Sequence, residues 1–139
     1  MRKLDFLIYG IVLLFGLLLF ILFNTNNTKE YNTIQLIVNN QIIDETHMYN
    51  ENTYLIVSDN TNIYIYKNNN LITKINNDLN KDIYNNVIIK DNKVIMSEAN
   101  CKGKDCLHME ISQEKKLPII CTNGVVIKLI ENNNSDIIV

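Results

Sequence analysis

The residues best suited to chemistry are three cysteines, Cys101, Cys106 and Cys121, which occur in the spacing C-x4-C-x14-C. A thiol can form a disulfide, bind a metal ion as a thiolate, or act as a redox nucleophile. Because the number of cysteines is odd, one disulfide within the chain would leave a third thiol without a partner. The sequence therefore raises two questions: which chemistry the group performs, and what the third thiol does.

A structural disulfide is the first interpretation, because an apolar N-terminal segment is expected to hold the cysteines outside the cytoplasm, where thiols tend to pair. Loop-closure entropy does not choose the pair. Joining Cys101 to Cys106 would stabilise the fold by about 2 kcal/mol, and either longer closure by about 3 kcal/mol. Cys121 lies at the end of a predicted strand, whereas the other two lie in the loop 100–106. A bridge between loop and strand would attach the loop to the sheet, which favours Cys121 as one partner.

Metal binding and redox chemistry are the competing interpretations. With His108 the spacing becomes C-x4-C-x-H-x12-C, which supplies four ligands for a tetrahedral zinc site. Lys102 and Lys104 would stabilise a neighbouring thiolate, as a redox-active cysteine requires, although the C-x-x-C spacing of disulfide exchangers is absent. Three reduced and inert thiols are the fourth interpretation.

Residues 6–23 form an apolar run of 18 residues without a charge. As a helix this run is about 27 Å long, close to the hydrocarbon core of a bilayer, which is about 30 Å thick. Arg2 and Lys3 precede it, so the positive-inside rule places residues 1–5 in the cytoplasm and residues 24–139 outside the cell membrane. A cleaved signal peptide would have a shorter run and small residues at its cleavage site. We therefore predict an uncleaved single-pass anchor in the lipid bilayer, followed by a polar spacer at residues 24–32.

Short apolar runs rich in β-branched residues alternate with Asn- and Asp-rich turns along the rest of the chain. We predict two-residue hairpin turns at Asp91-Asn92 and at Asn123-Gly124, the latter of type I′. Pro118 cannot donate to a ladder, so its strand should lie at a sheet edge or begin after Pro118. The pattern indicates an all-β fold, a small antiparallel barrel or sandwich preceded by one transmembrane helix, with no further helix. The predicted strands are 33–38, 41–43, 53–57, 62–66, 71–75, 86–90, 93–96, 117–122 and 124–130.

Composition argues against nucleic-acid binding and gives little support to catalysis. After residue 23 the chain has 11 lysines, no arginine and 14 acidic residues, a net charge of −3. A nucleic-acid surface needs clustered Lys or Arg, so we expect no nucleic-acid partner. Phosphate-binding glycine loops and the common hydrolase and metalloprotease motifs are absent from the sequence, so we predict no catalytic residue and no cofactor. We expect Asp44, Glu45 and His47 to be turn residues.

Residues 86–131 contain, in order, a strand, a turn, a strand, the pair Cys101 and Cys106, Cys121, and a closing hairpin through Asn123. This order resembles the NusG domain II family. The resemblance extends to residues 33–57 and is weak over residues 58–85, where this chain is longer. It implies a small β-barrel or sandwich, as found in some transcription elongation factors and in short membrane-anchored proteins of Gram-positive-type bacteria. No activity is settled for the anchored group. We place the domain at residues 33–131, followed by a C-terminal tail at 132–139.

The anchor and the scarcity of catalytic groups together favour an extracytoplasmic binding or interaction module. We expect its partner to be a protein in the same membrane. The alternative is a thiol-based redox or electron-transfer accessory protein that uses Cys101, Cys106 and Cys121. A carrier of a lipid or another small ligand inside the β domain is a third and weaker interpretation.

Overall fold

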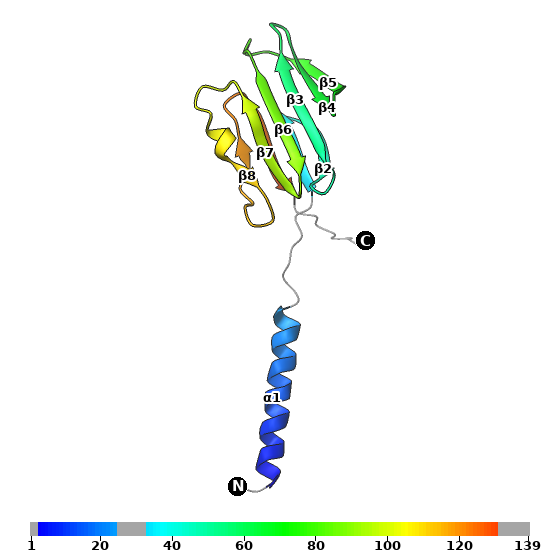
Figure 1. Ribbon diagram of the computed structural model, residues 1–139, viewed down its shortest axis with the longest axis vertical. Helices are drawn as coiled ribbons and strands as arrows, with labels where there is room; N and C mark the ends of the chain where they lie inside the picture. Colours follow the sequence, from blue (N-terminus) through cyan, green and yellow to red (C-terminus); the bar gives the residue numbers. More distant parts are fainter. Residues whose placement is uncertain (1–2, 25–32, 131–139) are drawn as a thin grey trace, which may run out of the picture.

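The computed structural model describes residues 3–24 and 33–130, which form one helix and one β domain (Figure 1). Helix α1 spans Lys3–Asn24, and its apolar side chains are exposed. The stretch Asp5–Phe23 is long and apolar enough to cross a membrane, a description that a single-pass anchor and a signal sequence both meet. The orientation of this helix stays a prediction. Apart from Asn24, the predicted spacer at 24–32 lies outside the described residues, as does the tail at 132–139.

The β domain contains two antiparallel sheets. One has four strands in the order β2-β1-β10-β9, and the other has six in the order β5-β4-β3-β6-β7-β8. All nine predicted strands are present, several of them with shifted ends, and β8 was not predicted. Within the described residues the elements after α1 are β1 Thr33–Val38, β2 Gln41–His47, β3 Asn52–Ser58, β4 Asn62–Lys67, β5 Asn70–Asn76, β6 Tyr84–Lys90, β7 Lys93–Ala99, η1 Asp105–His108, β8 Glu110–Ile111, β9 Ile119–Ile120 and β10 Val125–Ile130.

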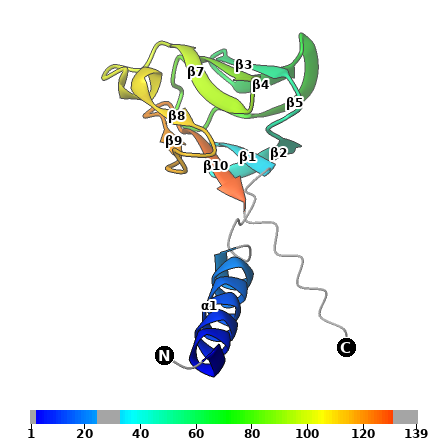
Figure 2. The ribbon, with the colours of Figure 1, turned by 60° about the horizontal axis from the view of Figure 1, so that its bottom comes forward.

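The two sheets pack face to face as two layers, with β3, β4 and β7 above β1, β2 and β10 in Figure 2. In most strands alternate residues point into the space between the layers, as the twofold period of a strand requires. In β3, for example, Tyr54 and Ile56 are buried while Thr53 is exposed. The predicted all-β fold is confirmed, and the packing is that of a sandwich. The buried core from the strands includes Ile34, Leu36, Val38, Tyr54, Ile56, Ile63, Ile65, Val87, Ile89, Val94, Met96, Ile111, Ile119, Val125 and Ile127.

Asn and Asp form the tight turns between neighbouring strands. Both central residues of the turns at 39–40, 68–69 and 91–92 have positive φ, the type I′ geometry that fits the twist of a hairpin. The turn at Asp91-Asn92 is therefore confirmed. The type I′ prediction for Asn123-Gly124 is wrong, because only Gly124 has a positive φ, of 86°. Thr122, Asn123 and Gly124 form a three-residue loop instead, closed by the Gly124 N–H on the Cys121 carbonyl at 3.0 Å.

Strand β2 extends to His47, so Asp44, Glu45 and His47 are strand residues and not turn residues. Their polar side chains misled the prediction because β2 is an edge strand with one side near solvent. Each of the three is held by another element. The Gln35 amide donates to Glu45, and His47 lies against Thr33 and stacks on Tyr49.

Asp44 connects the two sheets through a group that we call the polar bridge, formed by Asp44, Tyr54 and Lys67. The Tyr54 hydroxyl donates to Asp44 Oδ2 at 2.6 Å, and Lys67 Nζ lies 2.8 Å from the same oxygen. Burial acts to raise the pKa of Asp44, but the hydrogen bonds from Lys67 and Tyr54 and the charge of Lys67 outweigh it, so the pKa is lowered. Burial and the bond to Asp44 raise the pKa of Tyr54.

Candidate functional site

The three cysteines come from three separate segments of the chain, which the fold brings together. Cys101 follows β7, Cys106 lies in the short 3-10 helix η1, and Cys121 follows β9. The prediction of no helix after the anchor is therefore wrong at η1. Gly103 and Lys104 reverse the chain before η1, with Lys104 in the left-handed conformation at φ 54°. Because the chain reverses here, the Cys106 side chain lies next to the sulfur of Cys101.

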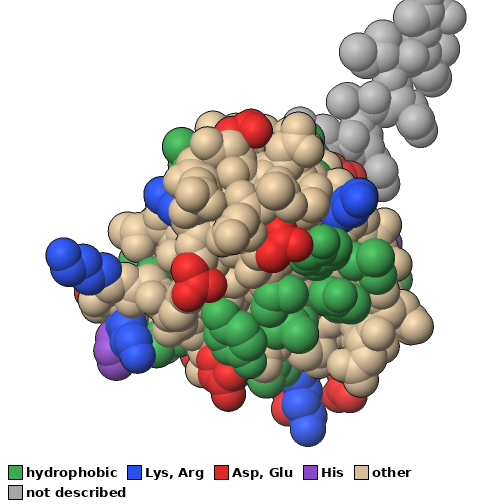
Figure 3. Space-filling model, turned by 90° about the horizontal axis from the view of Figure 1, so that it is seen from above, with side chains coloured by type: hydrophobic (Ala, Val, Ile, Leu, Met, Phe, Trp, Pro, Cys, Tyr) green, Lys and Arg blue, Asp and Glu red, His purple; other side chains and the backbone are tan. Residues whose placement is uncertain are grey.

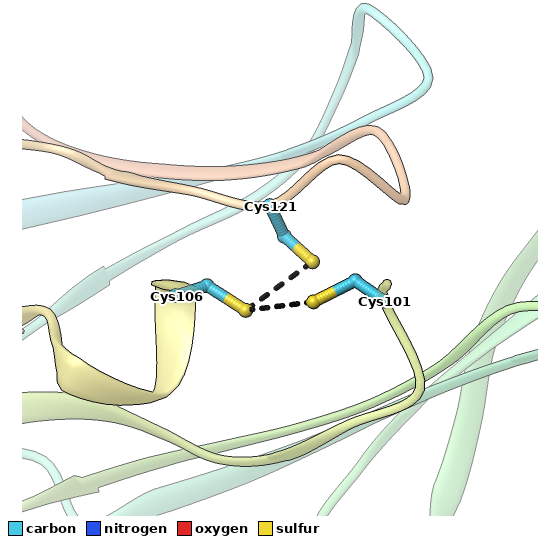
Figure 4. Close-up of side chains that lie close together, drawn as sticks. All are labelled: Cys101, Cys106 and Cys121. Carbon is cyan, nitrogen blue, oxygen red and sulfur yellow. Dashed lines mark hydrogen bonds between the residues drawn. The ribbon is translucent and has the colours of Figure 1, made fainter. Parts of the chain in front are cut away.

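The three side chains point toward one another (Figure 4). The Sγ atoms of Cys101 and Cys106 are 3.4 Å apart, as are those of Cys106 and Cys121. All three sulfur atoms lie within 4.8 Å of one another, and all three residues are buried. A disulfide requires an S–S distance of about 2.05 Å. The three thiols are free, so the structure does not support the disulfide that the sequence favoured. It does bring together the three residues proposed for it.

The thiols of Cys101 and Cys106 have opposite electrostatic environments. Burial acts to raise the pKa of Cys101, but hydrogen bonds from Cys106, Cys121, the Lys104 backbone N–H and the Thr122 side chain outweigh it and lower the pKa. Burial raises the pKa of Cys106, and the two neighbouring sulfurs add to that effect. Of these two thiols, Cys101 therefore has the environment that favours the thiolate, and Cys106 the one that favours the neutral thiol.

A chain of asparagine amides ends at the sulfur of Cys121, and its direction is set by the backbone. Asn100 Oδ1 accepts from the Tyr84 N–H at 2.9 Å, so it presents an oxygen to Asn123. Asn123 Nδ2 donates to Asn100 Oδ1 and to Asn85 Oδ1, both at 2.8 Å. Asn85 must then turn its Nδ2 the other way, where it lies 3.2 Å from Cys121 Sγ and 3.3 Å from Met96 Sδ. The asparagine network thus directs a fully buried N–H donor at the thiol group.

A pocket of about 200 Å³ opens beside the sulfur atoms. Besides the three cysteines, the residues that line it include Met109, Asp105 and Thr122. Asp105 Oδ2 lies against Gly103, only 3.1 Å from where a Cβ on that glycine would be. The pocket gives a small ligand or ion a route from solvent to sulfurs that are otherwise covered.

His108, the fourth ligand in the zinc prediction, is exposed and is not one of the side chains grouped with the three sulfurs. η1 turns the residues after Cys106 through one short helical turn, which places Met109 at the pocket and His108 outside it. Sequence reasoning missed Met109 and Asn85. A soft thioether three residues after Cys106 was a usable signal for Met109. No signal existed for Asn85, which is 36 residues from the cysteine it contacts.

Comparisons with known proteins support the fold and leave the activity open. The sequence matches no known protein-family model and no curated protein. Its structure is similar to the crystal structure of a DUF1312 family protein from Enterococcus faecalis V583, with a TM-score of 0.52 and 17% sequence identity. The match covers 73% of this chain and 98% of that chain. At this identity the similarity shows a shared fold, and it gives no specific support to the NusG domain II resemblance.

Proposed function

We propose that the protein is a membrane-anchored interaction module whose β domain, outside the cytoplasm, docks on a protein of the same membrane. The observation that carries this proposal is the outer face of the six-stranded sheet. We call the outer-face patch the six residues Leu55, Val57, Tyr64, Tyr66, Ile88 and Ile95, which alternate along their strands with buried core residues.

The outer-face patch consists of two apolar groups that meet on the diagonal between Leu55 and Ile88, whose direct partners across β3 and β6 are Asn86 and Thr53. Leu55 pairs with Tyr66 and Val57 with Tyr64 between β3 and β4, and Ile88 pairs with Ile95 between β6 and β7. The solvent face of an antiparallel sheet is normally polar, so apolar side chains concentrated on such a face are typical of an interaction site. The view from above shows a different aspect of the surface, on which hydrophobic side chains gather in one area bordered by acidic side chains (Figure 3). Tyrosines suit such a site because each offers a large apolar ring and a polar hydroxyl.

Helix α1 supports a partner in the same membrane. If it anchors the chain, the β domain is confined to a thin layer above the bilayer, which raises its effective concentration toward neighbouring membrane proteins. A modest apolar patch is then sufficient for stable association. The NusG domain II resemblance, carried by the spacing of Cys101, Cys106 and Cys121, is part of the same proposal. Short anchored members of that family have this arrangement of helix and β domain.

Site-specific photo-crosslinking in cells tests the proposal. A photo-reactive amino acid at Tyr66 should capture a membrane protein. The same residue at Ile42, an exposed position on the other sheet, is the matched control and should not capture it. The double variant Leu55→Ser and Tyr66→Ser should reduce co-purification of that partner about tenfold or more, the scale for loss of two central contacts. Equal capture from both positions, or none from Tyr66, would contradict the proposal.

A thiol-based redox accessory protein is the second candidate, favoured by the 3.4 Å separation of Cys101 and Cys106 and by their opposite pKa shifts. In such a protein the Cys101 thiolate attacks a partner's disulfide, and Cys106 then resolves the mixed disulfide. The pair loses two electrons and two protons, and the partner leaves as a dithiol. Alkylation followed by intact-mass measurement tests this candidate. The protein should be taken directly from cells grown with oxygen and from cells grown without it. Three free thiols in both samples would argue against this candidate.

A further inference from the structure

The sulfur atoms of Cys101, Cys106 and Cys121 already have the spacing of ligands in one coordination shell. Metal–thiolate bonds of about 2.3 Å in a tetrahedral site place neighbouring sulfurs about 3.8 Å apart. Two of the distances here are 3.4 Å and none exceeds 4.8 Å, so small movements would bring all three onto one ion. Their burial removes competition from water, and the adjoining pocket provides an entry path.

The asparagine network indicates that the sulfurs carry negative charge when the site is in use. Asn85 is fully buried, and its Nδ2 donates to two sulfur atoms, those of Cys121 and Met96. A neutral thiol or thioether is a weak acceptor, so a buried amide directed at two of them is poorly satisfied. A metal-bound thiolate accepts such a bond strongly, and donors of this kind orient and tune thiolate ligands. The network is therefore suited to a metal-bound Cys121.

The pocket lining decides which class of ion fits. Beyond the three cysteines, the lining includes Met109, whose side chain carries a thioether. The Asp105 carboxylate lies against Gly103, and His108 is not among the lining residues. Soft thiolate and thioether ligands select monovalent copper, while a closed structural zinc site takes a fourth thiolate or imidazole. We propose that Cys101, Cys106 and Cys121 bind one monovalent copper ion as thiolates, with Met109 as a weaker fourth ligand.

Binding is a ligand exchange without electron transfer. Each thiol that coordinates gives its proton to solvent, and copper keeps its single positive charge throughout. Three thiolates with one Cu⁺ leave a net charge of −2, which Lys104 at the pocket wall and Lys102 beside Cys101 partly balance. The inference goes beyond the interaction module and stands without it, and it competes with the redox candidate for the same thiols.

Anaerobic titration of the reduced full-length chain in detergent tests the proposal. Cu(I) is added in competition with a coloured bicinchoninate complex, and a parallel titration uses Zn(II). We expect one copper per chain, ultraviolet sulfur-to-copper charge-transfer absorption, and no displacement by equimolar Zn(II). Absence of copper binding would overturn the site. Displacement by equimolar zinc would overturn the copper assignment and leave a thiolate site for zinc.

Variants locate the ligands. Cys121→Ser should abolish one-to-one binding, and Met109→Leu should weaken it about tenfold, the smaller effect of losing a weak partner. Because Met109 is partly exposed, its replacement is compatible with folding even if a cysteine variant is not. Met48→Leu, at the end of the domain near Thr33, and His108→Ala are the controls and should leave the affinity unchanged. An effect of His108→Ala with none from Met109→Leu would overturn the role of the thioether.

Discussion

Two groups of side chains connect the sheets of this domain, and they differ in how well their polar atoms are satisfied. In the polar bridge, Asp44 of the four-stranded sheet meets Tyr54 and Lys67 of the six-stranded sheet. In the thiol group, Cys121 follows β9 of the first sheet, while Cys101 follows β7 of the second. Both groups span the same interface, but they use different chemistry.

In the polar bridge, the side chains form their hydrogen bonds and ion pair with one another. One carboxylate oxygen of Asp44 accepts from both a hydroxyl and an ammonium group, bonds that involve a charge and are therefore strong. The three thiols offer one another only weak hydrogen bonds and keep their capacity to coordinate a ligand. The comparison suggests that the first group stabilises the sandwich and the second is available for function. Stability measurements on matched variants separate these roles.

The largest effect is expected at Tyr54, whose ring is buried in the core beneath the polar bridge. Tyr54→Ala should lower the free energy of unfolding by about 3–5 kcal/mol, the usual loss when a buried aromatic ring is removed. Urea denaturation followed by near-ultraviolet circular dichroism measures it, because this signal reports the packing of tyrosine side chains. Tyr66→Ala makes the same chemical change on the outer face of the next strand, and its cost should be smaller by about 2 kcal/mol. Equal losses of unfolding free energy in the two variants would show that the polar bridge does not stabilise the fold.

A smaller, pH-dependent effect is expected from Asp44→Asn, about 1–2 kcal/mol at pH 7. Because the pKa of Asp44 is lowered on folding, its ionised form stabilises the folded state fully above the unfolded value, near 3.9. That contribution is lost as the pH falls through the folded pKa. The difference in unfolding free energy between wild type and variant should therefore shrink when the pH is lowered from 7 to about 2. A difference that stays constant with pH would show that the charge of Asp44 has no part in it.

The sequence predicted those features that depend on neighbouring residues. Alternating β-branched residues located the strands, and Asp91-Asn92 marked a hairpin because such residues tolerate positive φ. The sequence did not predict features that depend on contacts between residues far apart in the chain. Asp44 was assigned to a turn because nothing local shows that Tyr54 and Lys67 would lie against it.

The candidate site follows the same division. Spacing alone suggested that Cys101, Cys106 and Cys121 act together, and the fold gathers them. The spacing could not show that η1 would leave His108 exposed and bring Met109 to the pocket, because one helical turn decides which side chain lies at the pocket. The donor of Asn85 depends on a network that joins β6 to the loops at Asn100 and Asn123.

The smallest stability effect is expected within the thiol group itself. Cys106→Ala removes one buried sulfur that bonds only to other thiols, so the free energy of unfolding should fall by about 1 kcal/mol. Cys121→Ala should cost more, because it also leaves the buried Asn85 N–H without its acceptor. Both variants should lose the copper-dependent rise in stability that the wild-type chain gains from a ligand bound only when folded. A loss of 3 kcal/mol or more in Cys106→Ala without metal would mean that the thiols, like the polar bridge, are there to hold the sheets together.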